Sequence, residues 1–132
     1  MEIIKVHIDW EDNYGAASAA VPGCVATHKT FEGIKAAYTS ALEFHIAGMR
    51  KDGDEIPEVL QGEYTLEFEL TAQALLHRID GIITRAAISR ITGINEKQLG
   101  HYMTGHRNPR PAQRQKIIDG IHHIADDLST VV

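Results

Sequence analysis

Residues 84–99 read TRAAISRITGINEKQL, and this stretch decides the fold of the C-terminal half of the chain. Thr84 and Asn95 are residue types that cap helices, and each precedes a short run with apolar side chains at helical spacing. Gly93 separates the two runs and can adopt the positive φ that a tight corner requires. Three apolar side chains are expected to form a small shared core: Ile88, Ile94 and Leu99. The stretch predicts two short helices that meet at a sharp turn.

Helical patterns continue on both sides of this pair. A short helix precedes the pair and ends at Gly81, and the second helix of the pair ends at Gly105. After a loop at 106–110, Pro111 suits the first turn of a last helix. The last helix has an apolar face made of Ile117, Ile121, Ile124 and Leu128. Residues 71–132 are therefore expected to form an all-α domain.

The beginning of the chain has the pattern of strands. Apolar and polar residues alternate there, which predicts a half-buried strand with Ile4, Val6, Ile8 and Trp10 on its inner side. A second strand is expected at 14–21, where Pro22 and Gly23 end it, and a third is expected at 24–27. Residues 9–13 are interpreted as a polar hairpin turn between the first two strands.

A long helix and a final strand complete the N-terminal half. Thr30 is suited to cap the helix and Gly53 to end it. The apolar face of the helix consists of Phe31, Ile34, Tyr38, Leu42, His45, Ile46 and Met49. After a loop at 54–63, residues 64–70 alternate cleanly between apolar and polar. Residues 1–70 thus predict a small β-β-β-α-β domain, and the chain as a whole is expected to be α+β.

The formal net charge of −5 conceals a split between the two halves. Residues 1–70 carry a net charge of −8, whereas residues 71–132 carry a net charge of +3. Eight Lys and Arg residues lie between positions 77 and 116, opposed by two acidic residues. Such asymmetry points to a nucleic-acid-binding or partner-binding module. Two solvated surfaces of different composition are the simpler alternative.

The paired helices, followed by GHRNP at 105–109, resemble the helix-turn-helix domain of phage repressors of the Cro/Xre type over residues 72–128. The resemblance implies that the second helix of the pair enters the major groove of DNA. The candidate DNA-binding residues are Arg85, Asn95, Glu96, Lys97, Gln98, His101, Arg107 and Asn108. Gly100 departs from the pattern of these repressors, since it lies inside the second helix of the pair. Glycine inside a helix costs about 1 kcal/mol relative to alanine.

The N-terminal half resembles the antitoxins of the HicB type. VPGCVAT at 21–27 looks like their strand-to-helix segment, and residues 42–57 are similar to their helix end, turn and Ile-Pro exit. The sequence departs from that family at His28 and Lys29, and again at Gly33 and Ile34. The resemblance implies a partial RNase H-like domain joined to a DNA-binding helix-turn-helix domain.

Together the two resemblances imply an antitoxin of a type II toxin–antitoxin pair. The N-terminal domain (1–70) would neutralise a small basic mRNA-cleaving toxin of the HicA type, and its net negative charge suits such a partner. The C-terminal domain (71–132) would bind operator DNA and repress its own operon. One helix-turn-helix reads one half-site, so a homodimer or tetramer is expected. The alternative is a stand-alone transcriptional regulator with an N-terminal ligand- or protein-binding domain.

Enzymatic, metal-binding and membrane functions are not expected. A nuclease would need several carboxylates around metal ions, and beyond Asp9 and Glu43 no clear third or fourth acid stands at a strand end. Cys24 has no partner at metal-ligand spacing and no nameable catalytic partner. We therefore expect no catalytic residues, no metal and no cofactor. No apolar stretch is long enough to span a membrane and no signal peptide is visible, so a cytoplasmic protein is expected.

Overall fold

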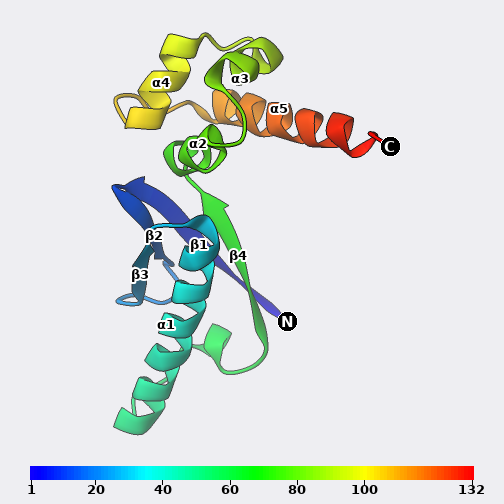
Figure 1. Cartoon of the computed structure of the whole chain (residues 1–132). Coiled ribbons are helices and arrows are strands. Elements are labelled where there is room, and N and C mark those ends of the chain that lie inside the picture. The colour runs from blue at the N-terminus through cyan, green and yellow to red at the C-terminus, as the bar shows by residue number, and fades with distance from the viewer. The chain divides into compact units, whose positions relative to one another are not determined.

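The computed structural model describes residues 1–132, which form two compact units at Met1–Ala74 and Leu75–Val132. Figure 1 shows a sheet with one long helix followed by a helical region, so the predicted α+β class is confirmed. The division falls inside α2 (Ala72–Asp80), whose early residue Ala74 is buried with the core of the sheet.

The first unit contains a four-stranded mixed sheet in the order β3-β2-β1-β4. Strands β1 (Glu2–Glu11), β2 (Asn13–Ala17) and β3 (Val25–His28) pair antiparallel, through a tight β1–β2 turn at Asp12 with φ 63°. Strand β4 (Tyr64–Leu70) pairs parallel with β1. A parallel neighbour requires a crossover connection, and α1 supplies it.

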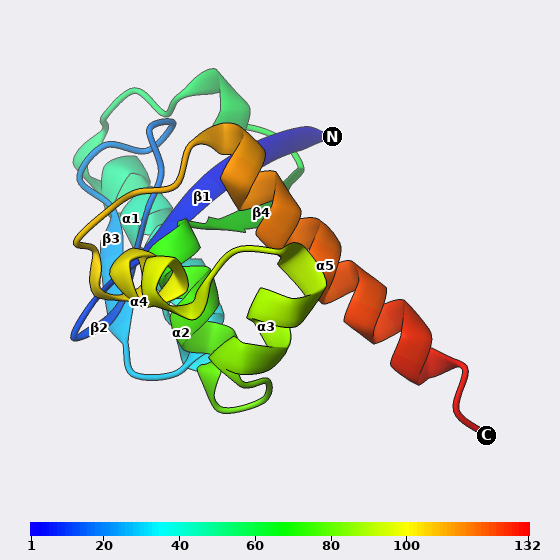
Figure 2. The same ribbon diagram turned by 90° about the horizontal axis from the view of Figure 1, so that it is seen from above.

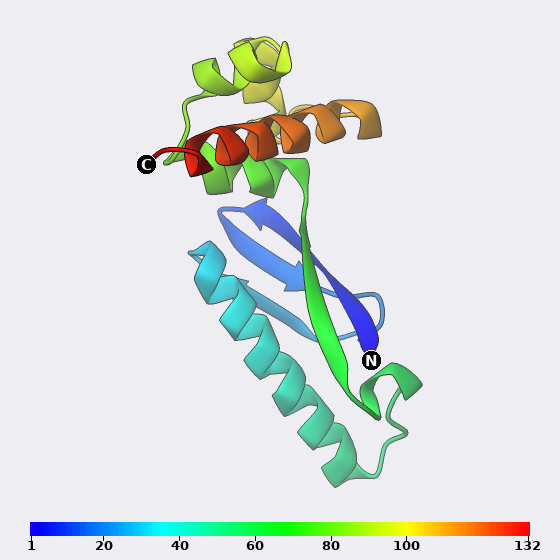
Figure 3. The ribbon, with the colours of Figure 1, turned by 90° about the vertical axis from the view of Figure 1, so that its right-hand side faces the viewer.

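Helix α1 (Phe31–Asp52) covers one face of this sheet (Figure 3). It begins and ends where expected, because Thr30 Oγ1 accepts a hydrogen bond from the Gly33 amide at 3.0 Å and Gly53 adopts a left-handed φ of 74°. The residues buried between helix and strands are Ile34, Tyr38, Leu42 and Ile46 from α1 and Ile4, Val6 and Ile8 from β1. The other face of the sheet has no helix of this unit over it.

Three expectations for the first unit need correction. The predicted second strand is too long, because Ser18 turns the chain out of the sheet: its hydroxyl donates to the Lys5 carbonyl at 2.6 Å, and its carbonyl accepts from the Val21 amide. The third strand begins at Val25 and not at Cys24. The expected loop at 54–63 contains a 3₁₀ turn, η1 (Glu58–Leu60), that buries Leu60.

The second unit is helical, as predicted, and Figure 2 shows its helices from above. After α2 come α3 (Arg85–Thr92), α4 (Glu96–Thr104) and α5 (Pro111–Ser129). Their shared core consists of Leu76, Ile79, Ile88, Ile94, Leu99, Tyr102 and Ile117. The expectation that Leu128 belongs to the buried face of α5 is wrong, since its side chain is 62% exposed beyond the end of the bundle. No helix is long and apolar enough to cross a membrane.

Candidate nucleic-acid interface

Helices α3 and α4 are joined as the sequence predicts, by two side-chain caps and one left-handed glycine. Thr84 Oγ1 accepts from the Ala87 amide at 3.1 Å, and Asn95 Oδ1 accepts from the Gln98 amide at 2.8 Å. Gly93 has φ 78°, and its amide donates to the Ser89 carbonyl. Beneath the turn the predicted shared core of Ile88, Ile94 and Leu99 is buried. The arrangement is consistent with a helix-turn-helix-like domain.

The outward face of α4 begins at its N-terminal end. Glu96 and Lys97 are exposed there, while Leu99 and Tyr102 are buried on the opposite side of the helix. The side chain of Asn95 is occupied by its cap, so its structural role is to hold the first turn of α4. Backbone amides and a favourable dipole at this end suit an anion.

Gln98 lies on the flank of α4 and not on its outward face. It is half-buried, and its Nε2 donates to the Tyr102 hydroxyl at 2.9 Å. Gln113 of α5 donates to the same hydroxyl at 3.5 Å. Bidentate recognition of adenine uses both the oxygen and the nitrogen of a glutamine amide. Since the amide nitrogen carries two N–H groups, the bond to Tyr102 leaves one donor and the oxygen for a base, but it fixes the direction in which the amide points.

His101 packs against the loop that follows α4. Its ring stands edge-on to His106 at a centroid distance of 4.8 Å, and its Nδ1 is buried without a hydrogen-bond partner. Burial, followed by the positive charges of His106, Arg107 and Lys97, lowers the pKa of His101. A neutral imidazole contributes a hydrogen bond and no charge, so we expect the cations around His101, and not His101 itself, to attract phosphate.

The loop between α4 and α5 forms a polar hollow beside α4. Gly105 turns the chain with φ 79°, and the Arg107 amide donates to the His101 carbonyl at 3.1 Å, which fixes the start of the loop. A cavity of about 370 Å³ is lined by Gln98, Tyr102, Arg107, Asn108, Arg110 and Gln113. The predicted pair Arg107 and Asn108 therefore meets Gln98 here.

Three residues of this hollow were not among the sequence candidates: Tyr102, Arg110 and Gln113. Arg110 could have been identified from the sequence, because it directly precedes Pro111, the expected first residue of the last helix, and therefore lies at a helix N-terminus. No local sequence pattern points to Tyr102 or Gln113, because they meet through a hydrogen bond between α4 and α5 and lie eleven residues apart in the sequence. The lining of the hollow is thus mostly polar and includes two arginine residues.

Arg85 approaches α4 from the start of α3. Its exposed guanidinium lies over the backbone of α4 at Gly100, where a Cβ would stand 2.6 Å from Nη1. An ion pair joins Lys35 and Glu32, whereas Arg85 and Lys97 have no carboxylate partner. The structure therefore brings one cation from α3 to the same helix that carries the predicted readout residues.

The uncovered face of the sheet in the first unit is charged. Lys5, His7 and Asp9 of β1 point to this face, since the alternate residues of β1 are buried under α1. Glu67 and Glu69 of β4 stand in register with Lys5 and His7. A shallow cavity of about 240 Å³ lies over β1 to β3, where His7 and Asp9 border small residues: Gly15, Ala16, Ala17 and Ala26.

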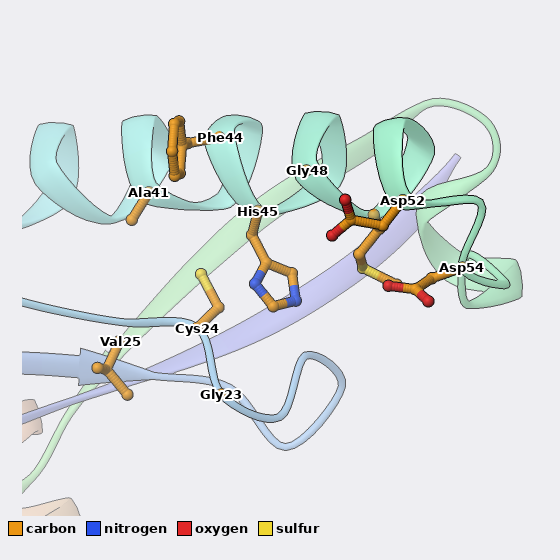
Figure 4. Close-up of a pocket in the computed structure, with 10 residues that line it drawn as sticks. Gly23, Cys24, Val25, Ala41, Phe44, His45, Gly48, Asp52 and Asp54 are labelled. Carbon is orange, nitrogen blue, oxygen red and sulfur yellow. The ribbon is translucent and has the colours of Figure 1, made fainter.

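A second cavity of the first unit, of about 440 Å³, lies between α1 and the turn before β3. Figure 4 shows the Cys24 thiol and the His45 ring beside each other, with Asp52 and Asp54 at the far end. Burial raises the pKa of Cys24, so its sulfur stays a protonated thiol and a poor nucleophile. No three or more His, Cys, Asp or Glu side chains are grouped so that they could hold a metal ion.

The comparisons with known proteins leave these sites without a family. No protein-family model matches the chain, and no curated protein matches it.

Proposed function

We propose that the chain is the antitoxin of a type II toxin–antitoxin pair, with a DNA-binding C-terminal unit and a toxin-binding N-terminal unit. The observation that carries the proposal is the outward face of α4, which is presented by a capped two-helix turn and bordered by cations. The toxin partner and the repression of the operon are proposed from the two sequence resemblances.

The DNA-binding half rests on charge and geometry together. Lys97 is exposed on the first turn of α4, Arg85 lies over the middle of the same helix, and Arg107 and Arg110 line the adjacent hollow. A helix of this length presented at its N-terminal end suits the major groove, and flanking cations suit the phosphate backbone. Because one such unit reads a single half-site, the operator complex is proposed to contain two or more copies.

The toxin-binding half rests on the uncovered sheet face. Glu67, Glu69 and Asp9 lie on this face, and the half of the chain around them carries a net charge of −8. A basic partner would be steered to such a surface. We propose that this surface, and not the cavity beside Cys24, is where a small basic mRNA-cleaving toxin docks.

Binding of DNA is tested by titrating the full chain with duplex DNA from upstream of its own coding sequence and with a scrambled duplex of equal length. The proposal predicts tighter binding to the first duplex and a loss of affinity with added salt, because phosphate contacts release counterions. Equal affinity for both duplexes at every salt concentration would reject sequence-specific repression.

Toxin neutralisation is tested by co-expression with a short neighbouring reading frame that encodes a small basic protein. Rescue of growth and co-purification are expected. Glu67→Lys should weaken both, whereas Glu43→Lys, the same charge change on an exposed position of α1, should not. If the chain binds its DNA but never its basic neighbour, it is the stand-alone regulator instead. Degradation of RNA by the pure chain with Mg²⁺, lost in Asp9→Asn, would make it a nuclease.

A further inference from the structure

The glycine inside α4 has no conformational reason to be there. Gly100 is not among the residues with positive φ, so any residue could adopt its backbone conformation. Glycine weakens a helix relative to alanine. Because position 100 does not need the backbone freedom of glycine, the glycine must have another reason, and that reason is the space next to its Cα atom.

That space is taken by Arg85. A methyl group at position 100 would stand 2.6 Å from Arg85 Nη1 and 3.9 Å from its Cζ, so the guanidinium rests where a side chain would otherwise begin. The three other helical glycines differ, and Gly33 in α1 faces the ring of His28. Gly48 in α1 has open space above it, and Gly120 in α5 faces the methyl group of Thr92 at 2.8 Å. Of these four glycines, Gly100 is the one that makes room for a guanidinium group.

The position of Gly100 determines on which face of α4 the Arg85 guanidinium lies. Lys97 stands three residues before Gly100 and therefore shares its face of the helix, away from the buried Leu99 and Tyr102. Arg85 thus adds a second cation to the face of α4 that carries Lys97. Neither cation has a carboxylate within ion-pairing distance, so their repulsion is left uncompensated within the chain. A phosphate group would compensate it.

We infer that Gly100 is a positioning residue, which seats the Arg85 guanidinium on α4 beside Lys97 so that the two cations hold one backbone phosphate of the operator. The inference rests on the proposed DNA binding and adds to it the origin of one contact. The first residue of α3 supplies a side chain that α4 lacks. A phosphate is favoured over a guanine edge because two adjacent cations attract a full negative charge more strongly than a neutral base.

The test replaces Gly100 with alanine in the full chain. Because the clashing atom is the far end of a flexible side chain, Gly100→Ala should fold, with a thermal midpoint equal to or above that of the wild type. Its affinity should fall on cognate and scrambled duplexes alike, and the slope of log affinity against log salt should decrease by about 1 per protomer. Gly48→Ala is the matched control, because it gives the same helix gain in open space and should leave DNA binding unchanged.

A double-mutant cycle separates this inference from its main competitor, in which Gly100 simply admits the DNA backbone. If Gly100 acts through Arg85, Gly100→Ala added to Arg85→Ala should cause no further loss. A further loss in the double variant, or wild-type affinity and salt slope in Gly100→Ala, would overturn the inference.

The seating of Arg85 is also measured without DNA. The Nε–H signal of Arg85 in a nitrogen–proton correlation spectrum should stand apart from those of mobile arginines in the wild type and should join them in Gly100→Ala. If the signal behaves in this way but the wild type binds no DNA, the proposed function is wrong while the seat is real. If the signal of the wild type already coincides with those of mobile arginines, the inference is wrong whatever the DNA binding.

Discussion

The cap of α4 allows stability and DNA binding to be changed in opposite directions at one residue. Asn95 Oδ1 accepts one hydrogen bond, from the Gln98 amide at 2.8 Å, and the site is exposed. Asn95→Ala removes this cap and should cost about 1 kcal/mol. For a domain of this size that corresponds to a fall of roughly 4–8 °C in the unfolding midpoint. Asn95→Ser keeps a capping oxygen and should restore most of the loss.

Asn95→Asp keeps the acceptor and adds a negative charge at a helix N-terminus, which the helix dipole favours. Its stability should therefore equal or exceed that of the wild type. Its affinity for DNA should fall, because the charge would lie at the end of α4 that is proposed to approach phosphates. Thermal unfolding followed by circular dichroism gives the first quantity, with amide hydrogen exchange in α4 to assign it to this unit. Titration with the duplex gives the second.

Two results would refute this reasoning. Wild-type stability in Asn95→Ala would show that the cap contributes nothing to α4. Wild-type DNA affinity in a fully folded Asn95→Asp would show that the N-terminal end of α4 does not face the DNA.

Three further changes have defined outcomes. Arg107→Ala should weaken binding to all duplexes equally and lower the salt slope by about 1 per protomer; an unchanged slope would remove Arg107 from the interface. Gly120→Ala should lower the urea midpoint of unfolding, because the added carbon would lie 2.8 Å from the methyl group of Thr92, whose side chain is held by two hydrogen bonds. Overpacking of this kind costs about 1–3 kcal/mol, whereas the gain in helix stability is about 1 kcal/mol. A raised midpoint would contradict this expectation. Burial raises the pKa of Tyr38 from 10.0 to about 12, so the folded chain retains a proton that the unfolded chain loses, and the free energy of unfolding should fall as pH rises between these values. Tyr38→Phe should reduce that fall, and an identical pH profile would contradict the assignment.

The parts of the fold that local chemistry determines are the parts that the sequence predicts. The caps Thr30, Thr84 and Asn95 and the left-handed Gly53 and Gly93 set helix ends through bonds to residues three or four positions away. Such bonds depend on the immediate sequence, so residue type suffices to place them. Both ends of α1, both ends of α3 and the start of α4 therefore lie where the sequence predicts them.

Features that depend on distant residues are not predicted. The second strand ends early because Ser18 bonds to Lys5, thirteen residues away, and no periodicity contains that information. The same holds for the hydrogen bond that turns Gln98 toward Tyr102 and for the guanidinium of Arg85 over Gly100. Sequence patterns therefore predict several residues of the candidate interface, but they miss Tyr102, Arg110 and Gln113 and do not tell which side chains point outward.

The central claim is that the unit built on α3 and α4 binds specific DNA. Fluorescence anisotropy with the full chain, a duplex from upstream of its coding sequence and a scrambled duplex measures this directly over a several-fold range of salt. We expect the first duplex to bind more tightly at every salt concentration and the affinity for both duplexes to fall as salt rises. No binding, or equal binding to both duplexes throughout, would show that this unit does not bind specific DNA.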